Sequence, residues 1–579
     1  MPPRTKTDLR ASRYRALTRT WALLLAACNP SDFDRVSGGI EHDGGRGLDA
    51  ASDRAGAGGA DAPGGPRAGG TEGGVAPPGA GDASDEGPDA PVRDAATEAG
   101  AAGEGGSTVC TTTCADQCVD LQSDPRHCGA CDAACGTGYG CIDARCGNVV
   151  VDVHTGVNAS YARLHDGEIW AWGSNQLGQL GESTTDGVLC LGGDDGGVFT
   201  SGSCRPEPGP VLLGPDERLR DVVQMSASFF HACAVTRAGE LLCWGKNEFG
   251  ELGHARGQSD DRACELYGGG ATLCNPTPVR VEELVGVTVA EVACGYDYTC
   301  ARSDAGEVYC WGHNTEGELG IAVDDPALDP ATQATPSPQK ISLPGTAVQL
   351  RVAIQSDTSC VLLENGGVTC WGAIERTVAV DRTPRGSDFV QFVVGRWAVC
   401  GLAPQGVSCW GSSNFGVLGR DPALGAATTP QPIIALSEPI AELVGADATL
   451  FAVASDGRVW SWGRNNYGTT GNSTLAGTGC GAQSCQFTPE LITDLRVQRL
   501  SVAGTAALAL DRDGAIWTWG MNSHAQLGHE PGAAGDIPCG AGSGRANEVC
   551  NPIPTRLGWP SADAGRRDRA PSPTYGASR

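Results

Sequence analysis

The chain has 579 residues, of which 85 are glycine and 26 are cysteine, and its formal net charge at pH 7 is −27. Nucleic-acid binding relies on basic patches that neutralise phosphates, so we expect no nucleic-acid partner. So many cysteines are typical of proteins that fold in an oxidising compartment outside the cytosol.

Residues 1–28 are expected to be a lipoprotein signal peptide. Six basic residues precede a short apolar run, Trp21–Ala27, which is too short to span a bilayer. The run ends in Leu-Ala-Ala-Cys28, which resembles a bacterial lipobox, where the cysteine thiol receives a diacylglycerol. This resemblance implies export, lipidation of Cys28, and a protein held at the outer membrane or cell surface by the lipid anchor only. An ordinary signal peptide, or a basic N-terminus without a targeting role, is the alternative.

Residues 29–108 are rich in glycine, alanine, aspartate and proline and have scarcely an aromatic residue. Such a composition buries too little apolar surface to offset chain entropy, so we predict a disordered linker. A coil of this length spans roughly 50 Å on the scaling of Gly-rich linkers. The tail, residues 561–579, is predicted to be disordered as well.

Residues 109–147 carry eight cysteines, at positions 110, 114, 118, 128, 131, 135, 141 and 146. So dense a cluster indicates either a disulfide module or a metal site, and Cys128-Gly-Ala-Cys131 has the spacing of zinc ligands. We favour four structural disulfides, because the protein is expected to be exported and His127 is the only local histidine. Their connectivity is open.

Seven Trp-Gly dipeptides divide residues 148–560 into repeats, and their starts lie 39 to 72 residues apart. They begin at Trp172, Trp244, Trp311, Trp371, Trp410, Trp462 and Trp519. Repeats of this length indicate a solenoid or a propeller. Two apolar runs around a Gly-containing turn precede each Trp-Gly, which predicts a β-hairpin, with Gly239 and Gly457 at positive φ. No helical periodicity competes, so the fold class is all-β.

The pattern W-G-x-N-x-x-G-Q-L-G, preceded by G-x-x-H-[TS]-x-A-L-x-x-D-G, resembles the repeat of the regulator of chromosome condensation. The resemblance covers residues 148–560 and implies a seven-bladed β-propeller, with the signature tryptophans in its core. Relatives include an exchange factor for a small GTPase, plant receptors and a secreted bacterial β-lactamase inhibitor. The resemblance is therefore specific for fold and weak for activity. We expect the C-terminal strand, 553–557, to pair into the blade that residues 149–156 begin.

Eight cysteines of the repeats flank the hairpin turns in pairs, nine or ten residues apart. The pairs are Cys233/Cys243, Cys300/Cys310, Cys360/Cys370 and Cys400/Cys409. In every repeat both positions are cysteine or neither is, which predicts cross-strand disulfides between directly opposed residues. The three repeats without them carry Trp170, Trp460 or Trp517 two residues before the signature tryptophan. We expect aromatic packing to replace the covalent link there.

A second set of paired cysteines lies in long insertions after the Leu-Gly of four repeats. These pairs are Cys190/Cys204, Cys264/Cys274, Cys480/Cys485 and Cys539/Cys550. Equivalent positions of a ring emerge on one side, so we predict a crown of disulfide-clamped loops, open at the degenerate fourth repeat. The clamps either pre-order a binding surface or protect the loops from proteolysis. Cys294 is left over, and we interpret it as an inert buried thiol.

The sequence lacks the motifs of common hydrolases and phosphate-binding loops, so we expect no catalytic residue, no cofactor and no metal. His231 is interpreted as a packed, hydrogen-bonded side chain. Weak calcium binding at Asp194-Asp195 stays open, and carbohydrate binding is disfavoured because Phe199 and Tyr267 are nearly the only aromatic residues of the insertions.

The function we favour is a monomeric, non-catalytic protein-interaction or adhesion module, with an unknown protein partner at the clamped loops. An enzyme inhibitor resembling the propeller-type β-lactamase inhibitor is the alternative. A propeller lyase or hydrolase is less favoured.

Overall fold

The computed structural model describes the backbone of residues 112–114, 117–119, 139–142, 145–182, 188–191, 198–266, 270–373, 380–381, 388–472, 480, 484–539 and 548–559. The predicted signal peptide, linker and C-terminal tail lie outside these ranges. Of the predicted cysteine-rich module, the structure describes two strand pairs, β1 (Thr112–Cys114) with β2 (Gln117–Val119) and β3 (Tyr139–Ile142) with β4 (Arg145–Asn148).

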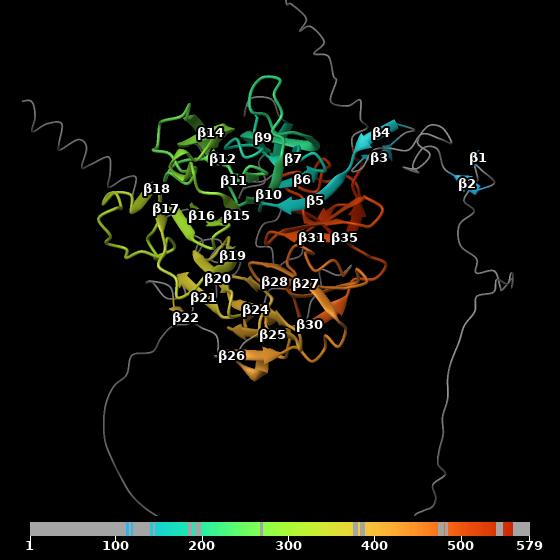
Figure 1. The fold of residues 1–579 in the computed structure, drawn as a ribbon. Helices are drawn as coiled ribbons and strands as arrows, with labels where there is room; N and C mark the ends of the chain where they lie inside the picture. The colour runs from blue at the N-terminus through green and yellow to red at the C-terminus, as the bar shows by residue number, and fades with distance from the viewer. Residues whose placement is uncertain are drawn as a thin grey trace, which may run out of the picture. The chain divides into compact units, whose positions relative to one another are not determined.

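From Val150 onward the described chain forms seven antiparallel sheets arranged around a common axis, so the predicted seven-bladed β-propeller is confirmed (Figure 1). Each sheet is one blade and is built from one contiguous stretch of sequence. In the described ranges the helical structure consists of short 3-10 turns, such as Glu282–Leu284. No helix in those ranges is long and apolar enough to cross a membrane.

The strands of the first three blades follow in spatial order. Blade 1 has β5 (Val150–Thr155), β6 (Ala159–Leu164), β7 (Ile169–Ser174), β9 (Val198–Pro210) and β8 (Val188–Leu191). Blade 2 has β10 (Val222–Ala227), β11 (His231–Thr236), β12 (Leu241–Lys246), β14 (Gly270–Arg280) and β13 (Arg262–Leu266). Blade 3 has β15 (Val289–Cys294), β16 (Tyr298–Ser303), β17 (Val308–His313) and β18 (Ala334–Lys340).

The other four blades follow the same plan. Blade 4 has β19 (Ala347–Ala353), β20 (Thr358–Leu363), β21 (Val368–Gly372) and β22 (Val380–Asp381). Blade 5 has β23 (Gln391–Val394), β24 (Ala398–Ala403), β25 (Gly406–Gly411) and β26 (Ala427–Pro432). Blade 6 has β27 (Ile440–Ala446), β28 (Thr449–Ala454), β29 (Val459–Arg464) and β30 (Cys485–Leu491). Blade 7 has β31 (Arg499–Val502), β32 (Ala506–Leu510), β33 (Ile516–Met521), β35 (Val549–Arg556) and β34 (Ile537–Pro538).

Three of the insertions fold into an extra outer strand and are not plain loops. β8, β13 and β34 add a fifth strand to blades 1, 2 and 7, which are consecutive around the ring. In blade 2 the added strand pairs with the first half of β14, from Arg262↔Cys274 to Leu266↔Gly270. This hairpin satisfies the backbone hydrogen bonds of its own segment, which is the general reason that a long polar insertion can be ordered.

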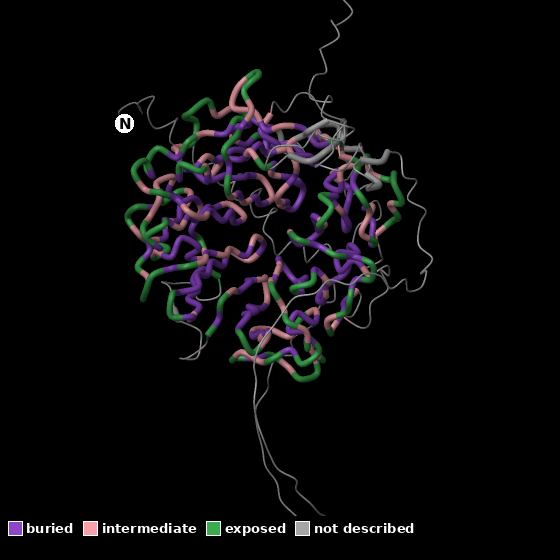
Figure 2. Tube along the Cα trace, turned by 45° about the vertical axis from the view of Figure 1, so that its right-hand side comes forward, coloured by how far each residue is buried: buried purple, intermediate pink, exposed green. Residues whose placement is uncertain are grey.

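The hydrophobic core lies between neighbouring blades. The buried stretches run through the blades, and many exposed stretches lie at the periphery of the ring (Figure 2). One cluster joins Val153 and Trp172 of blade 1 to Leu508 and Ile516 of blade 7. The signature tryptophans belong to this core, as predicted. Six of them are fully buried, and Trp410 is 6% exposed.

Six of the seven signature tryptophans also make a hydrogen bond to the preceding blade. The indole N–H groups of Trp172, Trp244, Trp311, Trp371, Trp462 and Trp519 donate to the carbonyls of Gln526, Gln179, Glu251, Glu318, Val417 and Thr469, at 2.7–3.0 Å. The following glycine is required because the backbone there has positive φ, 105° at Gly245, and a Cβ would lie 2.3 Å from the carbonyl of Phe230. The predicted positive φ of Gly239 and Gly457 is confirmed.

The first strand of each blade is innermost, because these strands contact one another around the ring. Side-chain amides connect them across the blade boundaries. Gln224 donates to the carbonyl of Val292 at 3.0 Å and accepts its N–H at 2.9 Å. Gln391 makes the same pair of bonds with Leu443, at 3.1 and 2.8 Å. These amides join backbones that belong to different sheets.

The predicted closure of the ring by a shared blade is wrong. The C-terminal strand β35 pairs with β33 inside blade 7, and β5 pairs with β6 inside blade 1. Blades 7 and 1 meet through side chains instead: Ser501 Oγ accepts the N–H of Thr155 at 3.0 Å, and the Trp172 indole donates to Gln526. Every blade is complete in itself, and this boundary shares the indole hydrogen bond with five others.

Candidate functional site

The propeller has two different faces. We call loop face the side on which the third strand of each blade ends, as at Lys246 and His313, and on which the insertions begin. The pairing of Lys246 with Cys274, and of Cys274 with Arg262, places the blade 2 insertion there. We call turn face the opposite side, which carries the hairpin turns such as that at Gly239.

A cluster of charged and aromatic side chains lies on the loop face at blades 2 and 3. The buried Lys246 amine contacts the Asp297 carboxylate of the next blade. The same amine lies 4.8 Å from the ring centroid of Phe249 and 5.8 Å from that of Phe230, within the range of cation–π interactions. The ring of Phe249 is in turn 4.6 Å from that of His313. Both phenylalanines are half-buried, so their outer edges reach solvent.

Phe229 and Tyr296 extend this cluster. Their ring centroids are 5.1 Å apart in an edge-on arrangement, and Tyr296 is 5.8 Å from Phe230. All three rings are half-buried. Aromatic residues are enriched at protein interfaces, and tyrosine, tryptophan and arginine are frequent among the few residues that carry most of the binding energy.

Buried carboxylates underlie the cluster at one position of the repeat. Glu251 and Glu318 replace the glutamine of the G-Q-L-G segment and are 0% and 1% exposed. The Glu318 carboxylate accepts the N–H of Glu316 at 2.6 Å, as the Gln179 amide oxygen in blade 1 accepts that of Leu177 at 2.9 Å. Either side chain can therefore hold this loop, and glutamate adds a buried charge.

A basic side chain accompanies each of these two carboxylates. Lys246 Nζ lies 3.7 Å from Glu251 Oε1, and His313 Nδ1 lies 3.1 Å from Glu318 Oε1. In blade 1, where the position is the neutral Gln179, the residue matching Lys246 is Ser174. The pairs Lys/Glu, His/Glu and Ser/Gln are visible in the repeat sequence, and our sequence analysis missed this signal.

The acidic groups of blades 3 and 4 raise the pKa values of two members of the cluster, Asp357 and His313. Burial, together with the nearby Glu318 and Asp297 carboxylates, raises the pKa of Asp357 to about 7. Burial alone would lower the pKa of His313, but its hydrogen bond with Glu318 and the surrounding carboxylates raise it. Proton binding near pH 7 therefore changes the charge of this part of the loop face.

A second charged and aromatic cluster lies at blades 5 and 6. The guanidinium of Arg464 contacts the Asp447 carboxylate and lies 5.8 Å from the ring centroid of Phe415. The Phe415 ring is 6.2 Å from that of Trp397, which Arg396 covers at 5.1 Å. Both aromatic residues are half-buried. None of the aromatic residues of the two clusters lies in the insertions, where the sequence analysis looked for them.

The structure joins all four predicted hairpin pairs as disulfides, Cys233–Cys243, Cys300–Cys310, Cys360–Cys370 and Cys400–Cys409, each with a Cα–Cα distance of 4.1 Å. The expected replacement of these bonds by tryptophan is wrong. Trp460, for example, pairs with Ala452, one residue out of the cysteine register and hence on the other face of the sheet. The buried Phe451 takes the place of the disulfide there.

The structure also joins three of the insertion pairs, Cys264–Cys274, Cys480–Cys485 and Cys539–Cys550. Cys204 is disulfide-bonded too, but the side chain of its predicted partner Cys190 lies outside the described residues. Cys28, the side chains of Phe199 and Tyr267, and the acidic pair at 194–195 lie outside them as well.

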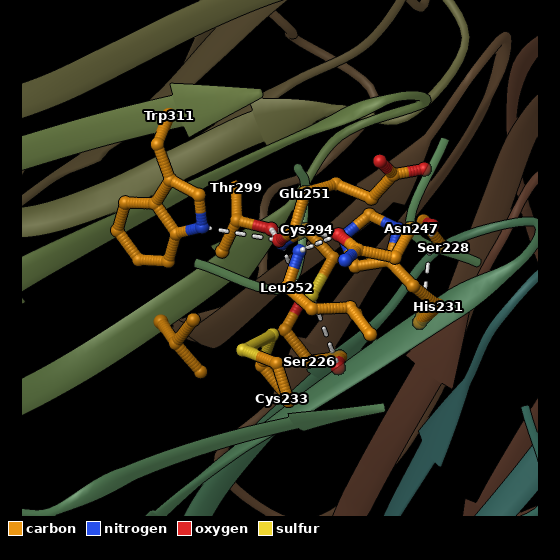
Figure 3. Close-up of a disulfide and its surroundings, with 12 residues drawn as sticks. Ser226, Ser228, His231, Cys233, Asn247, Glu251, Leu252, Cys294, Thr299 and Trp311 are labelled. Carbon is orange, nitrogen blue, oxygen red and sulfur yellow. Dashed lines mark hydrogen bonds between the residues drawn. A yellow bond between two sulfur atoms is a disulfide. The ribbon is translucent and has the colours of Figure 1, made fainter. Parts of the chain in front are cut away.

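Three potential metal donors meet among the described side chains: the ligand atoms of His231, Cys233 and Cys294 lie within 4.8 Å of one another (Figure 3). Cys233 is in a disulfide and offers no thiolate, so this donor set does not fit a metal. His231 is packed and hydrogen-bonded, as predicted, 3.0 Å from Ser228 Oγ and 2.9 Å from Thr299 Oγ1. Burial lowers its pKa to about 3.

Two profiles of the regulator of chromosome condensation (RCC1) repeat match the chain, one over residues 166–235, 238–302 and 456–510, the other over 222–251 and 289–318. These ranges match the RCC1 repeat, in agreement with the seven-bladed propeller of the described residues. A profile of the Stigma-specific STIG1-like protein family matches residues 97–166, which include the predicted cysteine-rich module.

Similar proteins cover most of the repeat region. The ultraviolet-B receptor UVR8 of Arabidopsis thaliana is 26% identical over 395 residues, which are 66% of this chain and 78% of the receptor. The crystal structure of Prp20p from Saccharomyces cerevisiae, reported with its binding properties to Gsp1p and histones, has 17% identity and a TM-score of 0.51 over 71% of this chain and 87% of that one. A structure of Kap60 bound to yeast RCC1 (Prp20) has a TM-score of 0.52 at 17% identity, over 72% and 88%. At this identity the structures establish the fold.

Proposed function

We propose that this protein is a non-catalytic binding module that engages a protein partner through its loop face. The observation that carries the proposal is the concentration of half-buried aromatic rings and buried ion pairs at blades 2–3 and 5–6 of that face. One structure named above shows yeast RCC1 (Prp20) with Kap60 bound, and the other is reported with the binding of Prp20p to Gsp1p and histones. Both support a protein ligand. In the blade 2–4 cluster the carboxyl groups of Glu251, Asp297, Glu318 and Asp357 outnumber the basic groups of Lys246 and His313. We therefore expect this part of the partner to be basic, with binding favoured above pH 7, where Asp357 is ionised.

We also propose that a lipid on Cys28 anchors the protein to the membrane. The Leu-Ala-Ala-Cys28 segment and the long linker support an exported lipoprotein, held at the cell envelope with its propeller tens of ångströms from the membrane. Metabolic labelling with a palmitate analogue tests this directly. Label that enters the wild type and is lost in Cys28→Ser is the expected result. Equal labelling of both proteins would contradict the anchor.

The binding face is tested with matched variants of the full-length protein. A partner is first captured by cross-linking and identified, and its affinity is then measured for purified wild type, Phe249→Ala, Trp397→Ala and Val390→Ala. Val390 is 66% exposed and precedes the innermost strand of blade 5 on the turn face, so it serves as the control. We expect the two loop-face variants to weaken binding at least tenfold and the control to leave it unchanged.

The same series separates the alternatives. Loss of binding only in Val390→Ala would move the site to the turn face and contradict the proposal. The inhibitor alternative predicts in addition that the partner is an enzyme whose activity falls on binding, in proportion to the occupied fraction. A partner that keeps its full activity at saturation leaves the interaction or adhesion role.

A further inference from the structure

The free thiol of Cys294 lies directly beside a disulfide of the neighbouring blade. Cys294 ends β15 of blade 3 and is 1% exposed, and its Sγ lies within 4.8 Å of Cys233 Sγ in β11 of blade 2 (Figure 3). It is the unpaired cysteine among the described side chains. Three sulfur atoms therefore occupy one blade boundary, two of them bonded and one free.

Backbone and side-chain hydrogen bonds hold Cys294 in this place. Its N–H donates to Ser226 Oγ at 3.0 Å, and its thiol donates to the carbonyl of Ser226 at 3.3 Å. Ser226 is the direct neighbour of Cys233 in the pairing of β10 with β11. Cys294 of blade 3 therefore lies beside the Cys233 end of the Cys233–Cys243 disulfide, and all three residues belong to one packed cluster.

The other hairpin disulfides have no such neighbour. By strand register, the residues that match Cys294 beside the disulfides of blades 3, 4 and 5 are Val352, Val394 and Gly445. A sulfur at this position occurs at the blade 2–3 boundary alone among these four boundaries, which provides an internal control.

We propose that Cys294 is an alternative disulfide partner of Cys233. Cys233 can then form a disulfide with Cys243 inside blade 2, or with Cys294 between blades 2 and 3. In the exchange the Cys294 thiol loses its proton, and the resulting thiolate attacks Cys233 Sγ. The Cys233–Cys243 bond breaks, the Cys233–Cys294 bond forms, and Cys243 leaves as a thiolate and takes up a proton. No external oxidant or reductant is consumed. The product cross-links two blades and removes the covalent link between β12 and β11, which stay paired through their backbones.

The native pairing is protected because burial raises the pKa of the Cys294 thiol to about 12, which leaves little thiolate at neutral pH. The rate of exchange is therefore expected to rise about tenfold for each unit of pH below that value, as the thiolate fraction does.

The first experiment removes the native partner. Full-length Cys243→Ser and the control Cys310→Ser are folded in a glutathione redox buffer, denatured, alkylated without reduction, digested and mapped by mass spectrometry. In Cys243→Ser we expect a Cys233–Cys294 cross-link and no alkylation of either residue. In Cys310→Ser, Cys300 has no neighbouring thiol and should be alkylated or glutathionylated, together with alkylated Cys294. Free Cys233 and Cys294 in a folded Cys243→Ser protein would overturn the proposal.

The second experiment uses the unaltered pairing and does not depend on that variant folding. Wild type and Cys294→Ser are incubated from pH 7 to 10 without oxidant, quenched with acid and mapped in the same way. The Cys233–Cys294 peptide and free Cys243 should appear in the wild type with the stated pH dependence and be absent from Cys294→Ser. A wild type that keeps Cys233–Cys243 intact at every pH would overturn the exchange.

Discussion

A basic residue lies beside each of the two buried glutamates at the G-Q-L-G position, Lys246 beside Glu251 and His313 beside Glu318. His313→Ser should leave the buried Glu318 carboxylate without its imidazole hydrogen-bond partner and destabilise the propeller by about 1–3 kcal/mol. The double variant His313→Ser/Glu318→Gln reproduces the Ser174/Gln179 pair of blade 1 and should recover at least half of this loss. Denaturant unfolding of the three proteins measures both effects. A double variant as unstable as the single one would show that the pairs are not interchangeable.

Asp357 makes the stability of the protein depend on pH, and its raised pKa fixes the direction of that dependence. Its pKa is raised from 3.8 to about 7 on folding, so the folded state holds a proton that the unfolded state has lost. The stabilisation that comes from protonated Asp357 is fully present below pH 4 and is lost as the pH rises through 7. Asp357→Asn should therefore gain stability relative to wild type between pH 5 and pH 8, by on the order of 2–4 kcal/mol.

Thermal or denaturant midpoints of wild type and Asp357→Asn, compared at each pH, isolate this group from others such as His231. His231 has a lowered pKa and changes stability in the opposite direction as the solution is acidified. A difference between the two proteins that stays constant from pH 5 to pH 8 would contradict the assignment.

At the scale of the hairpin, a cross-strand disulfide and a buried aromatic ring are two solutions for the same position. Cys360→Ala/Cys370→Ala should cost about 3 kcal/mol on the loop-entropy model, together with the packing that the sulfur atoms lose. Cys360→Phe/Cys370→Ser copies the Phe451/Ser461 pair of blade 6 and should lose less. Unfolding midpoints under non-reducing conditions rank the variants. A wild type whose midpoint is unchanged after complete reduction would show that the bond contributes nothing.

At the scale of the whole ring, blades 7 and 1 meet through the same indole-to-carbonyl hydrogen bond as blades 1 and 2. Trp172→Phe and Trp244→Phe each remove one buried indole N–H donor, the first at the closing boundary and the second inside the ring. Because the geometry is shared, we expect both to destabilise by a similar amount, about 1–2 kcal/mol. Limited proteolysis and unfolding midpoints check this. A much larger effect of Trp172→Phe would identify the closing boundary as the weak point of the propeller.

Local patterns in the sequence predict the seven blades, the hairpins and the pairing of the cysteines across each turn. These features depend on residues within about 15 positions of one another, where strand alternation and turn geometry leave few choices. The Trp-Gly signature also predicts its own burial, because a large apolar ring needs a core, although its bond to the preceding blade was not foreseen.

Only the tertiary structure decides what meets at the blade boundaries. Several contacts join residues of different sheets, which become neighbours only because two blades pack at a certain angle. They are the closure of the ring, the amide bridges of Gln224 and Gln391, the contact of Lys246 with Asp297 and the approach of Cys294 to Cys233. No periodicity along the chain encodes that angle. The charged and aromatic clusters of the loop face and the position of Cys294 beside Cys233 therefore follow from how the blades pack, and the blades themselves follow from the sequence.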